Sequence, residues 1–224
     1  ALHDKSCDRL LLAGKFTRLS LSALKLDSAG AALLGRLALK GDDNALRLVS
    51  EHFAEAQIKI LPNTDFLPNR TLPENYHFGR PLTSAEVSAL NLGGSVLSQL
   101  GGLDVGQSVI IQQDRVLGIE AAEGTQALIA RTAPLIDASA DAAVFVKMAK
   151  TQQDKILDMP VIGIATLKSL AEAGIGVAGV AAGQTMLADP LEAIEAELSL
   201  HGLVLTTSFD SKDAPSGIAE QTSS

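Results

Sequence analysis

The residues best suited to chemistry lie between Lys147 and Gly163. This segment reads Lys-Met-Ala-Lys-Thr-Gln-Gln-Asp-Lys-Ile-Leu-Asp-Met-Pro-Val-Ile-Gly, follows an apolar run and precedes a predicted helix. Lysine ammonium groups neutralise phosphate oxygens as point charges, and aspartate oxygens are ligands that suit Mg²⁺. The residue types therefore point to a site that binds an anion together with a hard metal ion.

The same segment has a second interpretation. Lysines and aspartates in a loop are also typical of a solvated surface with local ion pairs. Functional groups of α/β proteins gather on loops at the carboxyl ends of strands, which favours a site here. From spacing alone, the solvated surface is nevertheless the stronger interpretation.

A second candidate site lies at another strand-to-helix junction, in the segment Glu120-Ala-Ala-Glu123-Gly124-Thr125. Backbone N–H groups at the start of a helix bind phosphate, and the Thr125 hydroxyl could donate a further hydrogen bond. The competing interpretation is a Gly-Thr turn, with Glu123 favourably placed for the helix dipole. The sequence leaves these two interpretations equal.

The elements that must position these residues alternate between short apolar strands and helices, which predicts an α/β fold. Residues 104–207 form the predicted carboxyl-terminal α/β domain, which is the expected catalytic domain. Its predicted strands are 108–112, 115–120, 143–147, 176–181, 185–187 and 203–206. Its predicted helices are 124–132, 166–173 and one beginning at residue 190. We interpret 176–181 and 185–187 as a strand pair around Gly183.

The first 62 residues are typical of the back part of a doubly wound, Rossmann-like domain, with predicted strands at 10–14 and 57–61 and helical spacing from 33 to 54. Residues 63–103 are predicted to be a linker and a connecting helix, because prolines crowd the stretch from 62 to 81 and Thr83-Ser84-Ala85-Glu86 has the pattern of a capping box. Residues 208–224 are predicted to be a disordered tail. We expect two compact units with separate cores.

Composition excludes several classes of protein. The net charge is −8 without a basic stripe, so nucleic-acid binding has no electrostatic support. Cys7 is the single cysteine, which excludes an internal disulfide and is typical of a reducing compartment. The longest weakly polar run, 173–183, is too short to cross a bilayer. The first residues lack the features of a signal peptide and of an initiator methionine, so we expect the sequence to be cut from a larger protein.

Several of these segments resemble one enzyme family. Their residues follow one another in the family's order from about Cys7 to Leu205. The matching segments are 12–14, 40–43, 106–111, 116–125, 146–154, 158–166, 176–180, 182–183, 187–189 and 202–203. In these segments the chain is similar to the UDP-2,3-diacylglucosamine pyrophosphatases of lipid A synthesis, the family unrelated to the calcineurin-like enzymes that do the same work. The family opens with a glycine-rich strand and loop, and we expect the given sequence to begin after that segment; Lys15 stands where the family tends to have Asn.

The resemblance implies hydrolysis of UDP-2,3-diacylglucosamine to UMP and 2,3-diacylglucosamine 1-phosphate (lipid X), with Mg²⁺, at the inner face of the cytoplasmic membrane. It implies a cytoplasmic enzyme with a lipid-linked UDP-sugar as substrate and transient contact with the membrane surface; a homodimer stays open. The family's essential aspartate lies in the Asp-x-Pro-x-Ile-Gly motif, which is Asp158-Met-Pro-Val-Ile-Gly163 here. Asp154 stands where relatives carry a carboxylate.

These considerations assign expected roles to the candidate residues. The expected catalytic residues are Asp158, Lys147 and Lys150. Asp158 and Asp154 are the expected metal ligands. The expected substrate-binding residues are Glu123, Gly124, Thr125, Gln153 and Gly14. We expect Lys147, Thr125 and Asp158 to converge at one edge of the second domain's sheet. The alternative functions are a non-catalytic protein that binds a glycolipid phosphate or nucleotide sugar, which would need Thr125 and the lysines but not Asp158, and a structural interaction module.

Overall fold

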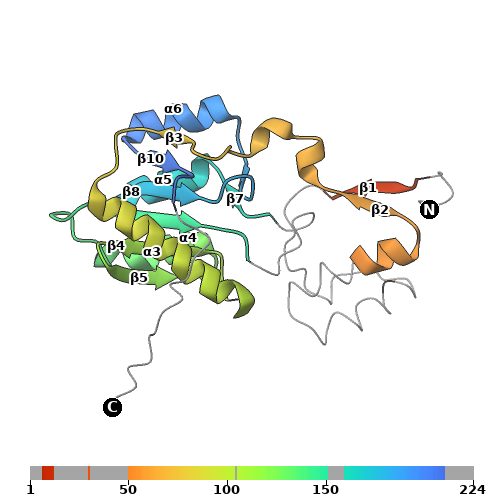
Figure 1. The fold of residues 1–224 in the computed structure, drawn as a ribbon, viewed down its shortest axis with the longest axis horizontal. Helices are drawn as coiled ribbons and strands as arrows, with labels where there is room; N and C mark the ends of the chain where they lie inside the picture. The colour runs from red at the N-terminus through yellow and green to blue at the C-terminus, as the bar shows by residue number, and fades with distance from the viewer. Residues whose placement is uncertain (1–6, 13–29, 31–49, 104, 151–158, 210–224) are drawn as a thin grey trace, which may run out of the picture. The chain divides into compact units, whose positions relative to one another are not determined.

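The computed structural model describes residues 7–12, 30, 50–103, 105–150 and 159–209 (Figure 1). The chain divides into two compact units: among the described residues, the first comprises those up to Pro68 together with Met159, and the second comprises the others. The expectations for Gly14, residues 151–158 and the tail beyond residue 209 lie outside the described residues.

The first unit contains a parallel pair of strands, β1 (Arg9–Leu11) and β2 (Lys59–Leu61). Leu10 is aligned with Ile60, and Ile60 is buried. A helical turn over residues 50–55 leads into β2, and the short helix η3 (Asn63–Asp65) follows it. Parallel strands so far apart in sequence require a crossover connection, which agrees with the predicted remainder of a doubly wound domain.

The second unit is built around a six-stranded sheet. Its strands, in sequence order, are β3 (His77–Phe78), β4 (Ser108–Gln112), β5 (Arg115–Ile119), β6 (Ala143–Lys147), β8 (Ile175–Val180) and β10 (Val204–Thr206). Its helices are α3 (Ser84–Leu100), α4 (Thr125–Thr132), α5 (Ile164–Glu172) and α6 (Leu191–His201), with short helices η4 (Pro68–Arg70), η5 (Gly101–Leu103) and η6 (Ala133–Leu135). Strands β7 (Val161–Ile162) and β9 (Met186–Leu187) form a separate small sheet.

The direction of the strands determines where functional groups can gather. The sheet order is β3-β10-β8-β6-β4-β5. Strands β6, β8 and β10 are parallel, β4 runs antiparallel to β6, and β5 runs antiparallel to β4. Strands β5, β6, β8 and β10 therefore all end at one edge of the sheet, where β4 begins. We call this the carboxyl edge.

Helices cover the sheet on both faces. Leu90 and Leu97 of α3 pack on one face with Val109, Val144 and Val146. On the opposite face, apolar side chains of α4, α5 and α6 pack on alternate residues of the same strands: Leu128, Leu167, Leu170, Ile194 and Leu198 against Ile110, Phe145 and Ala178. The outcome is a three-layer α/β/α unit whose core is almost entirely aliphatic, and the predicted α/β fold class is confirmed.

Helix α3 approaches the sheet closely because glycine stands where the two layers meet. A Cβ on Gly93 of α3 would lie 2.5 Å from Cγ2 of Val146, and a Cβ on Gly179 of β8 would lie 2.5 Å from Cδ2 of Leu90. The predicted capping box is confirmed: Glu86 N donates to the Thr83 hydroxyl, and Thr83 N donates to the Glu86 carboxylate. The helix expected in the linker region is thus part of the second unit, because its apolar face is buried against the sheet (Figure 1).

Glu86 also accepts two hydrogen bonds from the Arg80 guanidinium, at 2.8 and 2.5 Å, and is 1% exposed. The bonds from Arg80 lower the pKa of Glu86 below its ordinary value of 4.5, and those from Thr83 act in the same direction. Because the folded-state pKa is the lower one, the ionised carboxylate stabilises the fold fully above about pH 4.5, and this contribution is lost as pH falls through the folded-state pKa.

We predict that Glu86→Gln lowers the free energy of unfolding at pH 7 by about 1–2 kcal/mol, since Gln can still cap the helix but loses the charged pair with a half-exposed arginine. The difference from wild type should shrink as pH drops below the ordinary carboxyl value. Urea unfolding at several pH values measures it. Glu123→Gln, at the exposed pair of Glu123 with Arg131, is the control and should cost less. A pH-independent difference would contradict the role of the charge.

Most predicted elements are confirmed within a few residues, but one pairing is wrong. Residues 176–181 and 185–187 were expected to pair with each other around Gly183. Instead β8 lies between β6 and β10 in the large sheet, and β9 pairs with β7. Gly183, with φ of 63°, turns the chain out of the large sheet, and its N–H donates to Leu72 O. Among the described helices, none has the length and apolar character required to cross a bilayer.

Candidate active site

Three polar side chains lie in one row where β5, β4 and β6 meet the carboxyl edge. Glu120 N donates to Ser108 O at 2.8 Å, and Ser108 is aligned with Lys147 on the next strand. All three are buried: Glu120 is 7% exposed, Ser108 0% and Lys147 4%. Residues aligned on neighbouring strands project to the same face. The row therefore brings a carboxylate, a hydroxyl and an ammonium group together on the face that α4 covers.

The Thr125 hydroxyl joins the two ends of this row. Lys147 Nζ donates to Thr125 Oγ1 at 2.8 Å, and Thr125 Oγ1 donates to Glu120 Oε2 at 3.1 Å. Thr125 is the first residue of α4, so the amino-terminal end of this helix lies at the lysine. The predicted convergence of Lys147 and Thr125 is confirmed, whereas Asp158 lies outside the described residues.

Two glycines allow the backbone to pass close to this row. A Cβ on Gly106, just before β4, would lie 1.8 Å from the carbonyl oxygen of Glu120. Gly124 precedes α4 with φ of 82°, a left-handed conformation that glycine adopts without strain. The first glycine lets the chain before β4 lie against Glu120, and the second turns the chain from the end of β5 into α4. Together they place Thr125 above the polar row.

The row offers a phosphate group one charged donor, Lys147, beside the amino-terminal end of a helix. A buried lysine and a buried glutamate joined by one hydroxyl offset part of each other's desolvation cost. At the edge of the sheet, backbone N–H groups at the start of α4 add partial positive charge beside the ammonium group. An anion that reached Lys147 would meet a charged donor in surroundings drier than water, where the electrostatic attraction is stronger.

Glu123 has a different environment. Its Oε1 accepts hydrogen bonds from Nε and Nη2 of Arg131, at 3.1 and 3.0 Å, and Arg131 Nη2 also donates to Ile119 O. The backbone N–H of Glu123 itself and the Arg131 guanidinium hold the pKa of Glu123 below its usual range. Glu123 thus fastens the turn before α4 to the body of that helix. Of the two glutamates in this segment, Glu120 is the one that contacts Thr125.

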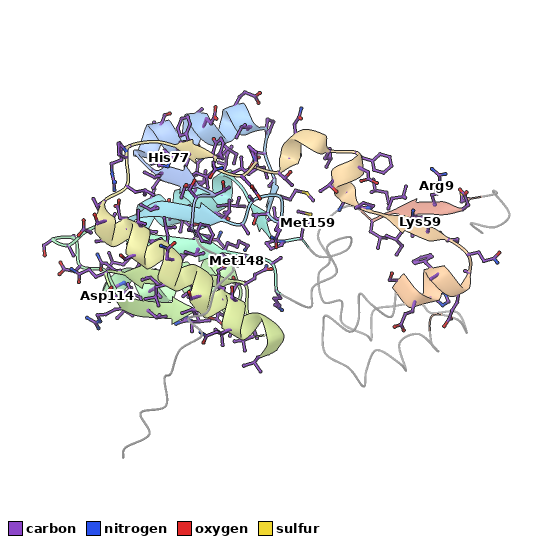
Figure 2. The ribbon with its side chains drawn as sticks, viewed as in Figure 1. Arg9, Lys59, His77, Asp114, Met148 and Met159 are labelled. Carbon is purple, nitrogen blue, oxygen red and sulfur yellow. The ribbon has the colours of Figure 1, made fainter. Side chains whose placement is uncertain are left out.

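Lys150 is half-buried and follows β6 by three residues on the carboxyl edge. Between Lys147 and Lys150, the Met148 N–H donates to Gln107 O, which continues the β4–β6 ladder beyond the strand ends. Met148 is labelled in Figure 2. The remaining candidates, which are Gly14, Gln153, Asp154 and Asp158, lie outside the described residues.

The downstream half of the aspartate motif is held by the small sheet. Met186 N donates to Pro160 O at 2.8 Å, and β7 pairs with β9 in parallel. Asp189 Oδ2 accepts from Ile164 N at 2.9 Å and so caps the start of α5. Gly163 permits this contact, because a Cβ there would lie 2.8 Å from the same oxygen. The fixed end of the motif therefore belongs to the second unit.

Sequence reasoning gave no role to Glu120, Ser108 or Asp189. Gly118 of β5 lies against side chains of α4. Side chains alternate between the two faces along a strand, so Glu120, two positions after Gly118, lies on the same face. That period was the available signal for Glu120. The same period applies to Ser108, two positions before Ile110, whereas Asp189 carried no signal, because its bond from Ile164 N joins segments that are far apart in the sequence.

Comparison with known proteins agrees with the resemblance. The family model of the LpxI N-terminal domain matches residues 1–70, and the model of the LpxI C-terminal domain matches residues 73–206. The chain is also 34% identical over 199 residues to the protein named UDP-2,3-diacylglucosamine pyrophosphatase LpxI of Caulobacter vibrioides, an alignment that covers 84% of this chain and 70% of the relative. The chain therefore belongs to the LpxI family.

Proposed function

We propose that the protein hydrolyses UDP-2,3-diacylglucosamine to UMP and 2,3-diacylglucosamine 1-phosphate, as a step of lipid A synthesis, with Mg²⁺. The substrate class comes from the name of the Caulobacter relative. The observation that carries the proposal is the buried Lys147 ammonium group, held on Thr125 at the start of α4 and at the carboxyl edge of the sheet. Cleavage of a diphosphate is favoured by positive charge held beside the phosphoryl oxygens.

Lys147 supplies that charge to the diphosphate in this proposal. Negative charge gathers on the leaving phosphate as the phosphorus–oxygen bond breaks, and a fixed cation stabilises it without reorganisation of solvent. The N–H groups at the start of α4, from Thr125 onward, hold the phosphate that stays on the sugar, and Gly124, whose own N–H donates to Ala121 O, turns the chain so that they face it. Lys150, on the same carboxyl edge, offsets further negative charge on the diphosphate.

Asp158 and Asp154 are the proposed ligands of Mg²⁺. Two carboxylates match the preference of this ion for hard oxygen donors. The residues after Asp158 are fixed by the bond from Met186 N to Pro160 O, which gives the motif a rigid base. When bound, the ion would offset charge on the diphosphate and lower the pKa of a coordinated water. Gln153 and Gly14 are proposed to contact the substrate.

The acyl chains of this substrate place the proposed reaction at the inner face of the cytoplasmic membrane, with transient contact between protein and lipid surface. Binding to that surface is proposed to need no spanning segment, because the substrate itself carries the apolar chains. Sedimentation with lipid vesicles in the presence of substrate would measure such contact.

Incubation of the intact protein with UDP-2,3-diacylglucosamine tests the proposal. Phosphorus NMR should show loss of the diphosphate signals and the appearance of two monophosphates in equal amounts when Mg²⁺ is present, and no change with EDTA. Saturable binding without turnover would instead indicate a carrier or sensor of the glycolipid. Neither binding nor turnover would indicate a structural module.

A further inference from the structure

Glu120 is a buried carboxylate that the proposed chemistry does not use directly. It stands at the end of β5, is 7% exposed, and accepts a hydrogen bond from Thr125 Oγ1 through Oε2. A glutamate is seldom buried in this way unless it is paired or hydrogen-bonded. Thr125 Oγ1 also accepts a hydrogen bond from Lys147 Nζ. This shared partner connects Glu120 to the lysine.

The direction of the two hydrogen bonds is set by chemistry. A threonine hydroxyl has one proton and two lone pairs, an ammonium group only donates, and an ionised carboxylate only accepts. The Thr125 proton therefore goes to Glu120, which leaves the oxygen's lone pairs for Lys147. Without an acceptor at position 120, the Thr125 hydroxyl could rotate, and the lysine would lose this one of its fixed contacts.

We propose that Glu120 is a positioning residue, which acts through the Thr125 hydroxyl to hold the Lys147 ammonium group at the carboxyl edge. The proposal rests on the proposed function of Lys147. Lysine side chains have several freely rotating bonds, so a cation at the end of one is well placed only where an acceptor fixes it. The row of Glu120, Ser108 and Lys147 across three strands gives this arrangement a rigid base.

The hydrogen bonds that join Glu120 to Lys147 run through Thr125 of α4 and not through Ser108 of the middle strand, β4. The Ser108 hydroxyl is fully buried and has no hydrogen-bond partner among the described residues. Glu120 and Lys147 stand on either side of it, and both instead contact Thr125 from α4. The connection between them therefore depends on Thr125, which makes the proposal testable by a double substitution.

The test compares Glu120→Met, which keeps the size but removes the acceptor, with Glu120→Gln, which keeps an acceptor oxygen. We expect Glu120→Met and Thr125→Val each to lower kcat by about 10²-fold, the cost of a misplaced catalytic group, with KM within about threefold. The double variant should be no slower than either single variant, because both break the same connection. Glu120→Gln should recover kcat to within about tenfold of wild type.

Two matched controls separate positioning from general damage. Thr132→Val makes the same change on the same helix, where the hydroxyl donates to the carbonyl oxygens of Leu128 and Ile129. Glu86→Met removes another buried carboxylate, on the opposite face of the sheet. Both should lower the melting temperature and leave kcat unchanged.

A readout without turnover keeps this proposal distinct from the proposed function. In ¹⁵N-lysine-labelled protein, the Lys147 ammonium signal should be resolved in wild type, Glu120→Gln and Thr132→Val, and lost by solvent exchange in Glu120→Met and Thr125→Val. That pattern supports positioning even if the wild type hydrolyses nothing. A Lys147 signal unchanged in Glu120→Met, or kcat losses that multiply in the double variant, would overturn the proposal.

Discussion

Asp158→Asn should abolish hydrolysis of UDP-2,3-diacylglucosamine while the substrate still binds. Asp158 opens the Asp-Met-Pro-Val-Ile-Gly motif and is the proposed ligand of Mg²⁺. Asparagine preserves the size of the side chain and one acceptor oxygen, but it loses the charge that would hold Mg²⁺. Loss of metal-assisted chemistry costs several kcal/mol of barrier, so kcat should fall by about 10³-fold or more.

Substrate affinity should survive this substitution within about tenfold, because the uridine and acyl chains contribute binding energy away from the reacting phosphorus. Single-turnover kinetics with excess protein separate binding from chemistry. Asp114→Asn is the control: Asp114 lies exposed in the hairpin turn between β4 and β5, at the end of those strands opposite the carboxyl edge (Figure 2). A folded Asp158→Asn protein with kcat within about tenfold of wild type would assign Asp158 to structure and make Asp154 the leading metal ligand.

Lys147→Met should give the second large effect. Methionine fills a similar volume on the end of β6 but removes the ammonium group that Thr125 holds. Removal of one preorganised donor from developing negative charge typically costs about 10²- to 10³-fold in kcat, and we expect a loss in this range. Lys168→Met, on the exposed surface of α5, is the matched control and should leave kcat unchanged.

Stability must be measured beside activity for this variant. Without Lys147, the buried Glu120 carboxylate keeps its hydrogen bond from Thr125 but loses the ammonium group on the other side of that hydroxyl, and a buried charge with less compensation is destabilising. The double variant Lys147→Met/Glu120→Gln removes both charges, so it should recover thermal stability without recovering activity. Recovery of activity together with stability would contradict a catalytic role for Lys147.

The large sheet could be predicted from the sequence because its strands are continuous apolar runs. Residues 108–112 and 143–147 were predicted with the bounds that β4 and β6 have, and the capping box marked the start of α3. These signals are local: each depends on neighbours in the chain. The same is true of Lys147, which is polar at the end of an apolar strand and therefore stands out.

The small sheet could not be predicted in the same way. Strands β7 and β9 have two residues each, too few for a periodic pattern, and they pair across more than twenty residues. Residues 185–187 were therefore assigned the nearer partner, which is wrong. The sequence also could not show which core α3 joins, since only tertiary packing places Leu90 and Leu97 against the large sheet.

The candidate site could also be predicted only in part from the sequence. Convergence of Lys147 and Thr125 follows from topology, because both stand where parallel strands end. The role of Glu120 does not, because the choice between Glu120 and Glu123 depends on which carboxylate faces α4 and which faces Arg131. Strand period gives the face, but the hydrogen bonds that decide the roles are tertiary contacts.

A crystal structure of the Asp158→Asn protein with UDP-2,3-diacylglucosamine bound tests most directly whether the diphosphate is cleaved at the carboxyl edge. The substrate should persist in that variant, and a diphosphate oxygen should lie about 3 Å from Lys147 Nζ, within hydrogen-bonding distance. The sugar phosphate should lie at the start of α4, beside Gly124. A diphosphate bound more than about 10 Å from Lys147, beyond the screening length of physiological salt, would contradict the account.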